Sequence, residues 1–182
     1  MPILGIIASQ ISGHLTPPDT GAMFPLGMVQ VGSGGSSSIS FTSIPATYKH
    51  LQIRGILRTA SDQSVLLTFN SSSSTYKNHY LEGSGSSVSA GAETNSGIAL
   101  YGLSVSNANI FGGFIWDILD YADTNKNKVL RALQGYDRNG SGYLDFDSGL
   151  WVNTSAITSV TIVPTGGTTF QQYSQFALYG IK

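Results

Sequence analysis

Turn-forming clusters of Gly, Ser, Asn and Asp interrupt the sequence about every ten residues between positions 39 and 182, with short β-branched and aromatic runs between them. No segment keeps apolar residues at helical spacing over a comparable length. About nine or ten such runs, with no βαβ pattern, predict an all-β protein, namely an antiparallel β-sandwich of jelly-roll-like topology. A closed barrel is the alternative.

Alternation within individual runs supports this prediction. In residues 48–59, aliphatic side chains share one parity and polar side chains the other, as in a strand with one buried face. Gly55 interrupts the apolar parity, which indicates a bulge or a close approach of another backbone. Residues 110–121 are apolar on both faces, which predicts a central strand or a subunit contact. We expect further strands at residues 64–69, 98–105, 128–136, 158–163 and 174–181.

The first part of the chain has a different character. Residues 1–38 contain four of the six prolines and end in VGSGGSSS, which predicts an extended N-terminal arm and Gly/Ser linker before a sandwich domain at residues 39–182. The opening segment has no basic residue before its short apolar run, so we interpret it as mature protein. The polar, low-complexity segments 71–75 and 83–97 are expected to be loops at one rim of the sandwich.

The first fifteen residues carry six aliphatic side chains and no charge; the aliphatic residues are Ile3, Leu4, Ile6, Ile7, Ile11 and Leu15. Burying six aliphatic side chains contributes roughly 9–18 kcal/mol, and ordering each residue costs about 1–2 kcal/mol of backbone entropy. These terms nearly cancel, so we expect the arm to order by adding a strand to a partner. Packing under its own sandwich is the alternative.

Composition limits the partners. The formal net charge is -1 and only 10% of residues are charged, against roughly 25% in an average soluble domain. This balance argues against nucleic acid or an anionic membrane, which both favour clustered Lys and Arg. No stretch approaches the roughly 18 apolar residues of a membrane span. The absence of cysteine excludes disulfides, a thiol nucleophile and a thiolate zinc site.

The segment from Asp137 to Asp145 resembles the first nine positions of a calcium loop, with oxygen-bearing side chains at positions 1, 3, 5 and 9 and glycine at position 6. Position 12 is Ser148 where the loop requires a bidentate Glu, and the flanking segments alternate like strands. The Asn139-Gly140 pair is by itself a strong hairpin signal. We therefore favour a β-hairpin over a calcium site.

Residues 143–152 also alternate, with one parity formed by Leu144, Phe146, Leu150 and Val152 and the other by Tyr143, Asp145, Asp147 and Trp151. The two aspartates are expected on the polar side, roughly 6.5–7 Å apart between Cα atoms. Inverting glycosidases use a similar spacing, but a catalytic acid also needs an apolar pocket, so we favour a solvated pair. The neighbouring aromatic residues make this parity a candidate glycan-binding or subunit-contact face.

No catalytic signature accompanies these residues. The sequence contains no G-x-S-x-G elbow, H-E-x-x-H pair, Walker loop or dinucleotide fingerprint, and its three histidines are isolated. We predict no catalytic residues, no cofactor and no metal site.

Four segments resemble structural proteins of tailed-bacteriophage virions: MPILGIIASQISG at residues 1–13, IPATYKHLQIRGILR at 44–58, ILDYADTNKNK at 118–128 and SQFALYGIK at 174–182. The resemblance implies a β-sandwich on a virus particle, made in the host cytoplasm, often a homotrimer, with its N-terminal segment toward the particle. It implies no catalytic residues.

From the arm and the resemblance together, we expect a non-enzymatic capsid decoration, or cement, protein that fastens subunits of the major capsid protein through its arm. The alternative is a tail-fibre or baseplate module that recognises a host surface glycan, and an enzyme acting on host polysaccharide is a more distant third.

Overall fold

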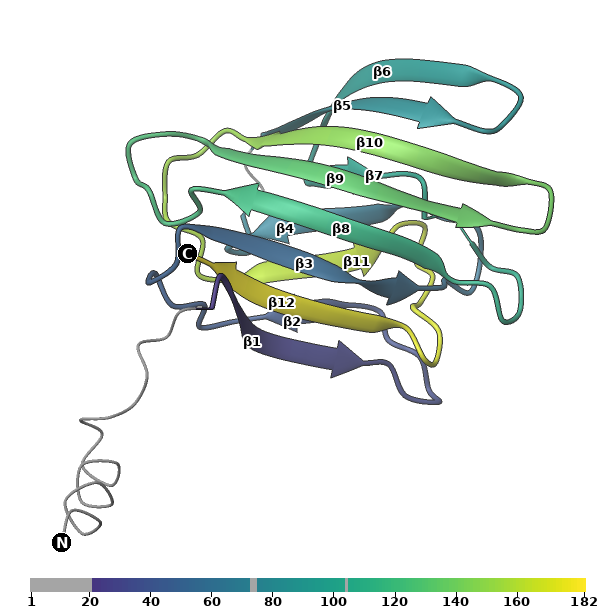
Figure 1. Cartoon of the computed structure of the whole chain (residues 1–182), viewed down its shortest axis with the longest axis horizontal. Helices are drawn as coiled ribbons and strands as arrows, with labels where there is room; N and C mark the ends of the chain where they lie inside the picture. Colours follow the sequence, from purple (N-terminus) through teal and green to yellow (C-terminus); the bar gives the residue numbers. More distant parts are fainter. Residues whose placement is uncertain (1–20, 73–74, 104) are drawn as a thin grey trace, which may run out of the picture.

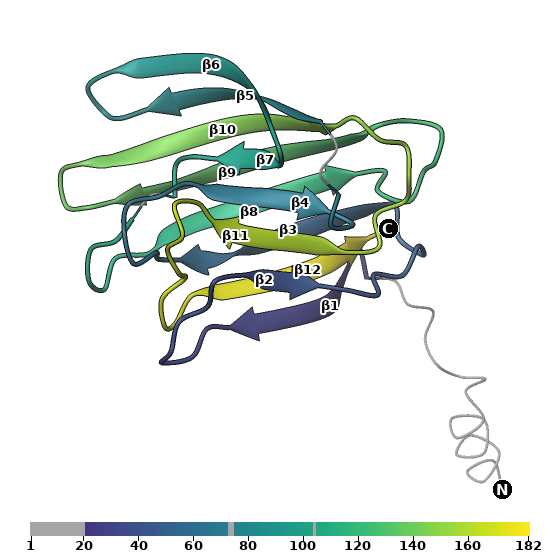
Figure 2. The ribbon, with the colours of Figure 1, turned by 180° about the vertical axis from the view of Figure 1, so that it is seen from behind.

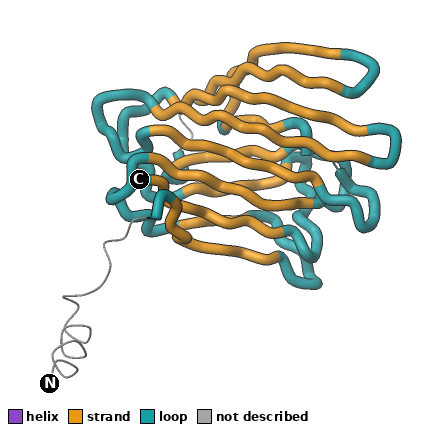
Figure 3. The backbone as a smooth tube through the Cα atoms, in the orientation of Figure 1, coloured by secondary structure: helices purple, strands orange, loops and turns teal. Residues whose placement is uncertain are grey.

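The computed structural model describes residues 21–72, 75–103 and 105–182. The described residues form strands, turns and loops, with no helix (Figure 3). The twelve strands are β1 Met23–Gln30, β2 Ile39–Phe41, β3 His50–Leu57, β4 Val65–Phe69, β5 Tyr76–Gly83, β6 Val88–Asn95, β7 Ile98–Leu100, β8 Gly112–Leu119, β9 Lys128–Asp137, β10 Gly142–Trp151, β11 Val160–Pro164 and β12 Gln175–Ile181. Within the described part of the chain, no helix is long and apolar enough to cross a membrane.

The strands form two antiparallel sheets that pack as a sandwich (Figures 1 and 2). The larger sheet has the order β1-β12-β3-β8-β9-β10-β5-β6, and the smaller has the order β2-β11-β4-β7. From β2 to β8 the chain passes between the sheets as in a jelly roll, with β5 and β6 as neighbours in the larger sheet and β11 returning to the smaller one. The β9–β10 hairpin is inserted between β8 and β5, and β12 and β1 extend the other edge.

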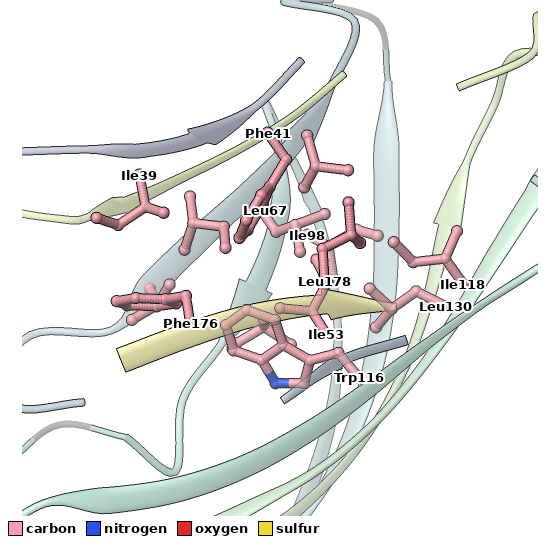
Figure 4. Close-up of a cluster of buried hydrophobic side chains, with 14 of the residues drawn as sticks. Ile39, Phe41, Ile53, Leu67, Ile98, Trp116, Ile118, Leu130, Phe176 and Leu178 are labelled. Carbon is pink, nitrogen blue, oxygen red and sulfur yellow. The ribbon is translucent and has the colours of Figure 1, made fainter. Parts of the chain in front are cut away.

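The core lies between the smaller sheet and the inner face of the larger one (Figure 4). On β3, Leu51, Ile53 and Leu57 are fully buried, which confirms the predicted alternation. Aromatic rings fill the centre: Trp116 stacks on Phe114 with 4.1 Å between ring centroids, and Phe114 contacts Phe176. β8 is an interior strand of the larger sheet, as its apolar character on both faces predicts.

Gly55 lies where two backbones come close, one of the two possibilities the sequence indicated. A Cβ atom at this position would lie 1.9 Å from the carbonyl oxygen of Gln175 on the neighbouring strand β12. No side chain larger than hydrogen fits there without a backbone shift.

The predicted hairpin at Asn139-Gly140 is confirmed. These two residues have φ values of 59° and 104°, and the Arg138 amide donates to the carbonyl oxygen of Ser141. Positive φ at both central positions is the conformation of a tight hairpin turn. In the described ranges, no three or more acidic or histidine side chains group in a way that could hold a metal ion.

Two predictions about segments at the edges of the sandwich are wrong. β1 lies inside the range assigned to the arm and linker, yet it pairs with β12 over most of its length, so the sandwich begins near residue 23. β6 lies inside the expected loop 83–97 and pairs with β5. Both are edge strands, where one side needs no partner and the hydrophobic alternation is weak. The predicted arm residues Ile3, Leu4, Ile6, Ile7, Ile11 and Leu15 lie outside the described residues.

Candidate functional site

Strand β10 has the opposite orientation to the one expected. Asp145, Asp147 and Trp151 are fully buried, whereas Leu144 and Phe146 are 62% and 55% exposed. The prediction of a solvated carboxylate pair, and of a surface formed by all four residues of that parity, is therefore wrong. Only Tyr143 remains partly exposed.

Trp151 explains this orientation. Its indole ring stacks on Tyr76 at 6.2 Å between centroids and contacts Phe69 of the smaller sheet at 5.6 Å. Burying this large aromatic cluster is worth several kcal/mol, and successive side chains on a strand alternate between faces. Trp151 therefore places the two aspartates inside as well.

The buried aspartates have incomplete hydrogen bonding. Asp145 accepts from the backbone amide of Gly102 through Oδ2, and Asp147 accepts through Oδ2 from Gln134 Nε2 at 2.9 Å. Gln134 in turn accepts from the indole nitrogen of Trp116 at 2.7 Å. The Oδ1 atoms of both aspartates have no hydrogen-bond partner among the residues that the structure describes. A charged carboxylate in this position would lack much of the solvation it has in water.

Burial raises the pKa of both carboxyls. The pKa of Asp145 rises to about 6, with the charge on Glu82 adding to burial and the Gly102 amide opposing it. The pKa of Asp147 rises to about 8 because of burial, then the charges on Asp145, Glu82 and Glu93. A raised pKa suits a general acid, but neither aspartate has exposed surface through which a polysaccharide could reach it. The pair is a protonatable part of the interior.

The side of the larger sheet that faces away from the smaller sheet carries a wide apolar surface. In register, Phe146 of β10 lies opposite Leu81 of β5 and Leu133 of β9, and Leu133 lies opposite Ile115 of β8. We call this surface the outer apolar face; its large exposed residues are Ile56, Leu81, Val88, Ile115, Val129, Leu133, Leu144 and Phe146.

Two hollows lie in the outer apolar face. One, of about 490 Å³, forms over Gly113 and Gly135, which have no side chains to fill it. The other, of about 290 Å³, lies beside Gly83. Leu133 and Leu144 line both hollows and form the ridge between them.

A third, more polar pocket is lined by residues near the turn of the β9–β10 hairpin. Figure 1 shows this turn at the rim of the sandwich. We call this pocket the rim pocket. It has a volume of about 290 Å³ and is lined by Asp62, Glu82, Tyr101, Tyr136, Arg138 and Tyr143. Tyr143 is thus the one member of the predicted glycan or subunit-contact face that lines this pocket.

Arg138 organises the rim pocket. Its Nη1 atom donates to Asp62 at 3.0 Å and its Nη2 atom to the Tyr136 hydroxyl at 2.7 Å, while its guanidinium carbon lies 4.8 Å from the centre of the Tyr136 ring. Tyr136 in turn packs at 5.8 Å on Tyr143. Hydrogen bonding from Ser106 and the Arg138 guanidinium lower the pKa of Asp62, which favours the charged form of this ion pair.

Sequence reasoning missed most of the rim pocket because its residues come from separate parts of the chain. Asp62 lies between β3 and β4, Glu82 is at the end of β5, and Tyr101 follows β7. No local spacing connects these positions, and only the pairing of β5, β10 and β9 brings their ends together.

Comparisons with protein-family models, curated proteins and solved structures find no match for this chain.

Proposed function

We propose that this chain is a non-enzymatic structural protein of a tailed-bacteriophage virion, a capsid decoration protein that oligomerises through its outer apolar face and fastens capsid subunits through its N-terminal arm. The outer apolar face carries the proposal. Its apolar area is on the order of several hundred Å², a size that marks interaction surfaces on otherwise soluble proteins. The four virion-like sequence segments and the uncharged aliphatic arm support the location on a particle.

The occupant that we propose for this face is a second copy of the same chain. A standard interface buries about 800 Å² per partner, and the outer apolar face supplies a large part of that area. The charged side chains on the same side of the sheet include Asp117, which lies opposite Arg131 in register, and also Arg54 and Lys77, which lie opposite Ile115 and Leu150. The resemblance to virion proteins favours three copies.

The first test measures the oligomeric state in solution. We expect the full chain to elute as an oligomer in size-exclusion chromatography with light scattering, and the double variant Leu144→Ser, Phe146→Ser to elute as a monomer. Both side chains point away from the core, so the variant should fold. Met28→Ser is the matched control, because Met28 is 73% exposed on the edge strand β1. A monomeric wild-type chain would exclude the proposed contact.

The second test locates the protein on the particle. A particle reconstruction should show many copies distributed over the shell, with the outer apolar face covered by neighbouring copies. A few copies at a single vertex would instead favour the tail-associated alternative.

A further inference from the structure

The rim pocket combines aromatic surface with polar groups that have no partner among the described residues. Tyr143 is 37% exposed, and its hydroxyl makes no hydrogen bond to a described residue. The Glu82 carboxylate likewise has no hydrogen bond or ion pair within the described part of the chain. The ring and hydroxyl of Tyr143 and the carboxylate of Glu82 therefore line the same cavity.

The fixed charges of the pocket limit the ligand class. The carboxylates of Asp62 and Glu82 disfavour an anion, and the Glu93 carboxylate, which accepts a hydrogen bond from the Tyr101 hydroxyl, adds negative charge beside the pocket. A cation would lie beside the Arg138 guanidinium, which Asp62, Asn107 and Tyr136 hold in place. A neutral ligand avoids both repulsions.

The free groups require a ligand that donates hydrogen bonds, and they allow one that also accepts them. Glu82 can only accept while it is charged, whereas the Tyr143 hydroxyl can do either. The ring of Tyr143 also offers an apolar face. A sugar has C–H groups on one face of its ring and hydroxyl groups around the edge, so it satisfies all three requirements at once.

The geometry points to the rim pocket as a binding site for one neutral sugar residue, with the sugar ring against Tyr143 and its hydroxyl groups on Glu82. The volume of about 290 Å³ is near the lower end of known ligand pockets and suits a monosaccharide unit. This inference and the proposed oligomer contact rest on different observations, although Tyr143 also lines the larger hollow of the outer apolar face and Glu82 lines the smaller one.

Saturation-transfer NMR on the full chain tests the inference, with D-glucose, D-galactose, D-mannose, L-rhamnose and N-acetyl-D-glucosamine as probes. We expect at least one of them to bind with a dissociation constant on the order of 1 mM. Tyr143→Ala should weaken that binding about tenfold or more, and Glu82→Gln should weaken it several-fold because a charged acceptor is lost. Tyr173→Ala is the control, since Tyr173 is 58% exposed and does not line the pocket.

The inference would be overturned if none of the five sugars showed saturation transfer from the protein. Equal binding by wild type and Tyr143→Ala would also overturn it, because the sugar would then lie elsewhere. Parallel titrations with the cation spermine and the anion N-acetylneuraminic acid test whether the pocket prefers a neutral ligand. Tighter binding of either charged probe than of the neutral sugars would contradict the inference. A thermal melt of each variant establishes that weaker binding does not arise from unfolding.

Discussion

At the scale of single residues, the buried aspartates predict an unusual dependence of stability on pH. The pKa values of Asp145 and Asp147 rise from the usual aspartate value of 3.8 to about 6 and about 8. The folded chain therefore keeps protons that the unfolded chain releases, and the free energy of unfolding falls as pH rises from about 4 to about 8. We expect the melting temperature to fall by on the order of 10 °C across this range.

Substitution identifies the source of this dependence. Asp147→Asn should flatten the profile between about pH 6 and pH 8 and raise the melting temperature at alkaline pH, because the amide oxygen can still accept from Gln134. Asp120 affects stability in a different pH range. Side-chain hydrogen bonds from Lys126 and Lys49 lower its pKa to about 2, so its contribution to the free energy of unfolding is lost only below about pH 4. The exposed Asp137→Asn serves as control. An unchanged slope in Asp147→Asn would contradict the assignment.

These aspartates also show why sequence alone misplaced part of the site. The period of two in residues 143–152 is real, but both parities contain apolar residues, so the pattern does not say which face is inside. Which face is buried depends on the contacts of Trp151 with Phe69 and Tyr76, which lie on other strands. The Asn139-Gly140 turn could be predicted because its conformation depends on the two residues themselves.

At the scale of strands, the close contact between β3 and β12 predicts a strong effect at Gly55. Gly55→Ala places a Cβ atom against the Gln175 carbonyl and must separate the two backbones, so we expect a loss of at least about 2 kcal/mol in guanidinium unfolding. Gly113→Ala in the neighbouring strand β8 is the control, because nothing lies within 4 Å of its Cβ position. Equal stability of the two variants would contradict the close approach.

Strand prediction succeeded where one face of a strand is buried along most of its length. The residues expected at 64–69, 128–136 and 174–181 correspond to β4, β9 and β12, whose burial alternates clearly. It failed for β1 and β6, in which every residue is exposed or only partly buried. Edge strands are held mainly by backbone hydrogen bonds to one neighbour, and those bonds leave little trace in residue type.

At the scale of the whole molecule, the last prediction is that the sandwich folds without the arm and that the arm is needed for attachment. The buried hydrophobic residues of the described chain lie between Val31 and Leu178, and the strands that contain them pair with one another. Deleting residues 1–15 should therefore leave the melting temperature nearly unchanged, since the core loses no described contact. Under the proposed function, the same deletion should abolish attachment to particles that lack the protein, measured by co-sedimentation.

The two readouts of this deletion separate the possible roles of the aliphatic arm. If the truncated chain melts at much lower temperature or fails to fold, the arm contributes to the core of its own subunit, and loss of attachment would say nothing about a partner. If the truncated chain is stable and still attaches, the sandwich itself carries the contact and the fastening role of the arm is wrong. The Leu144→Ser, Phe146→Ser variant, tested in the same assay, then shows whether oligomerisation through the outer apolar face is what attachment requires.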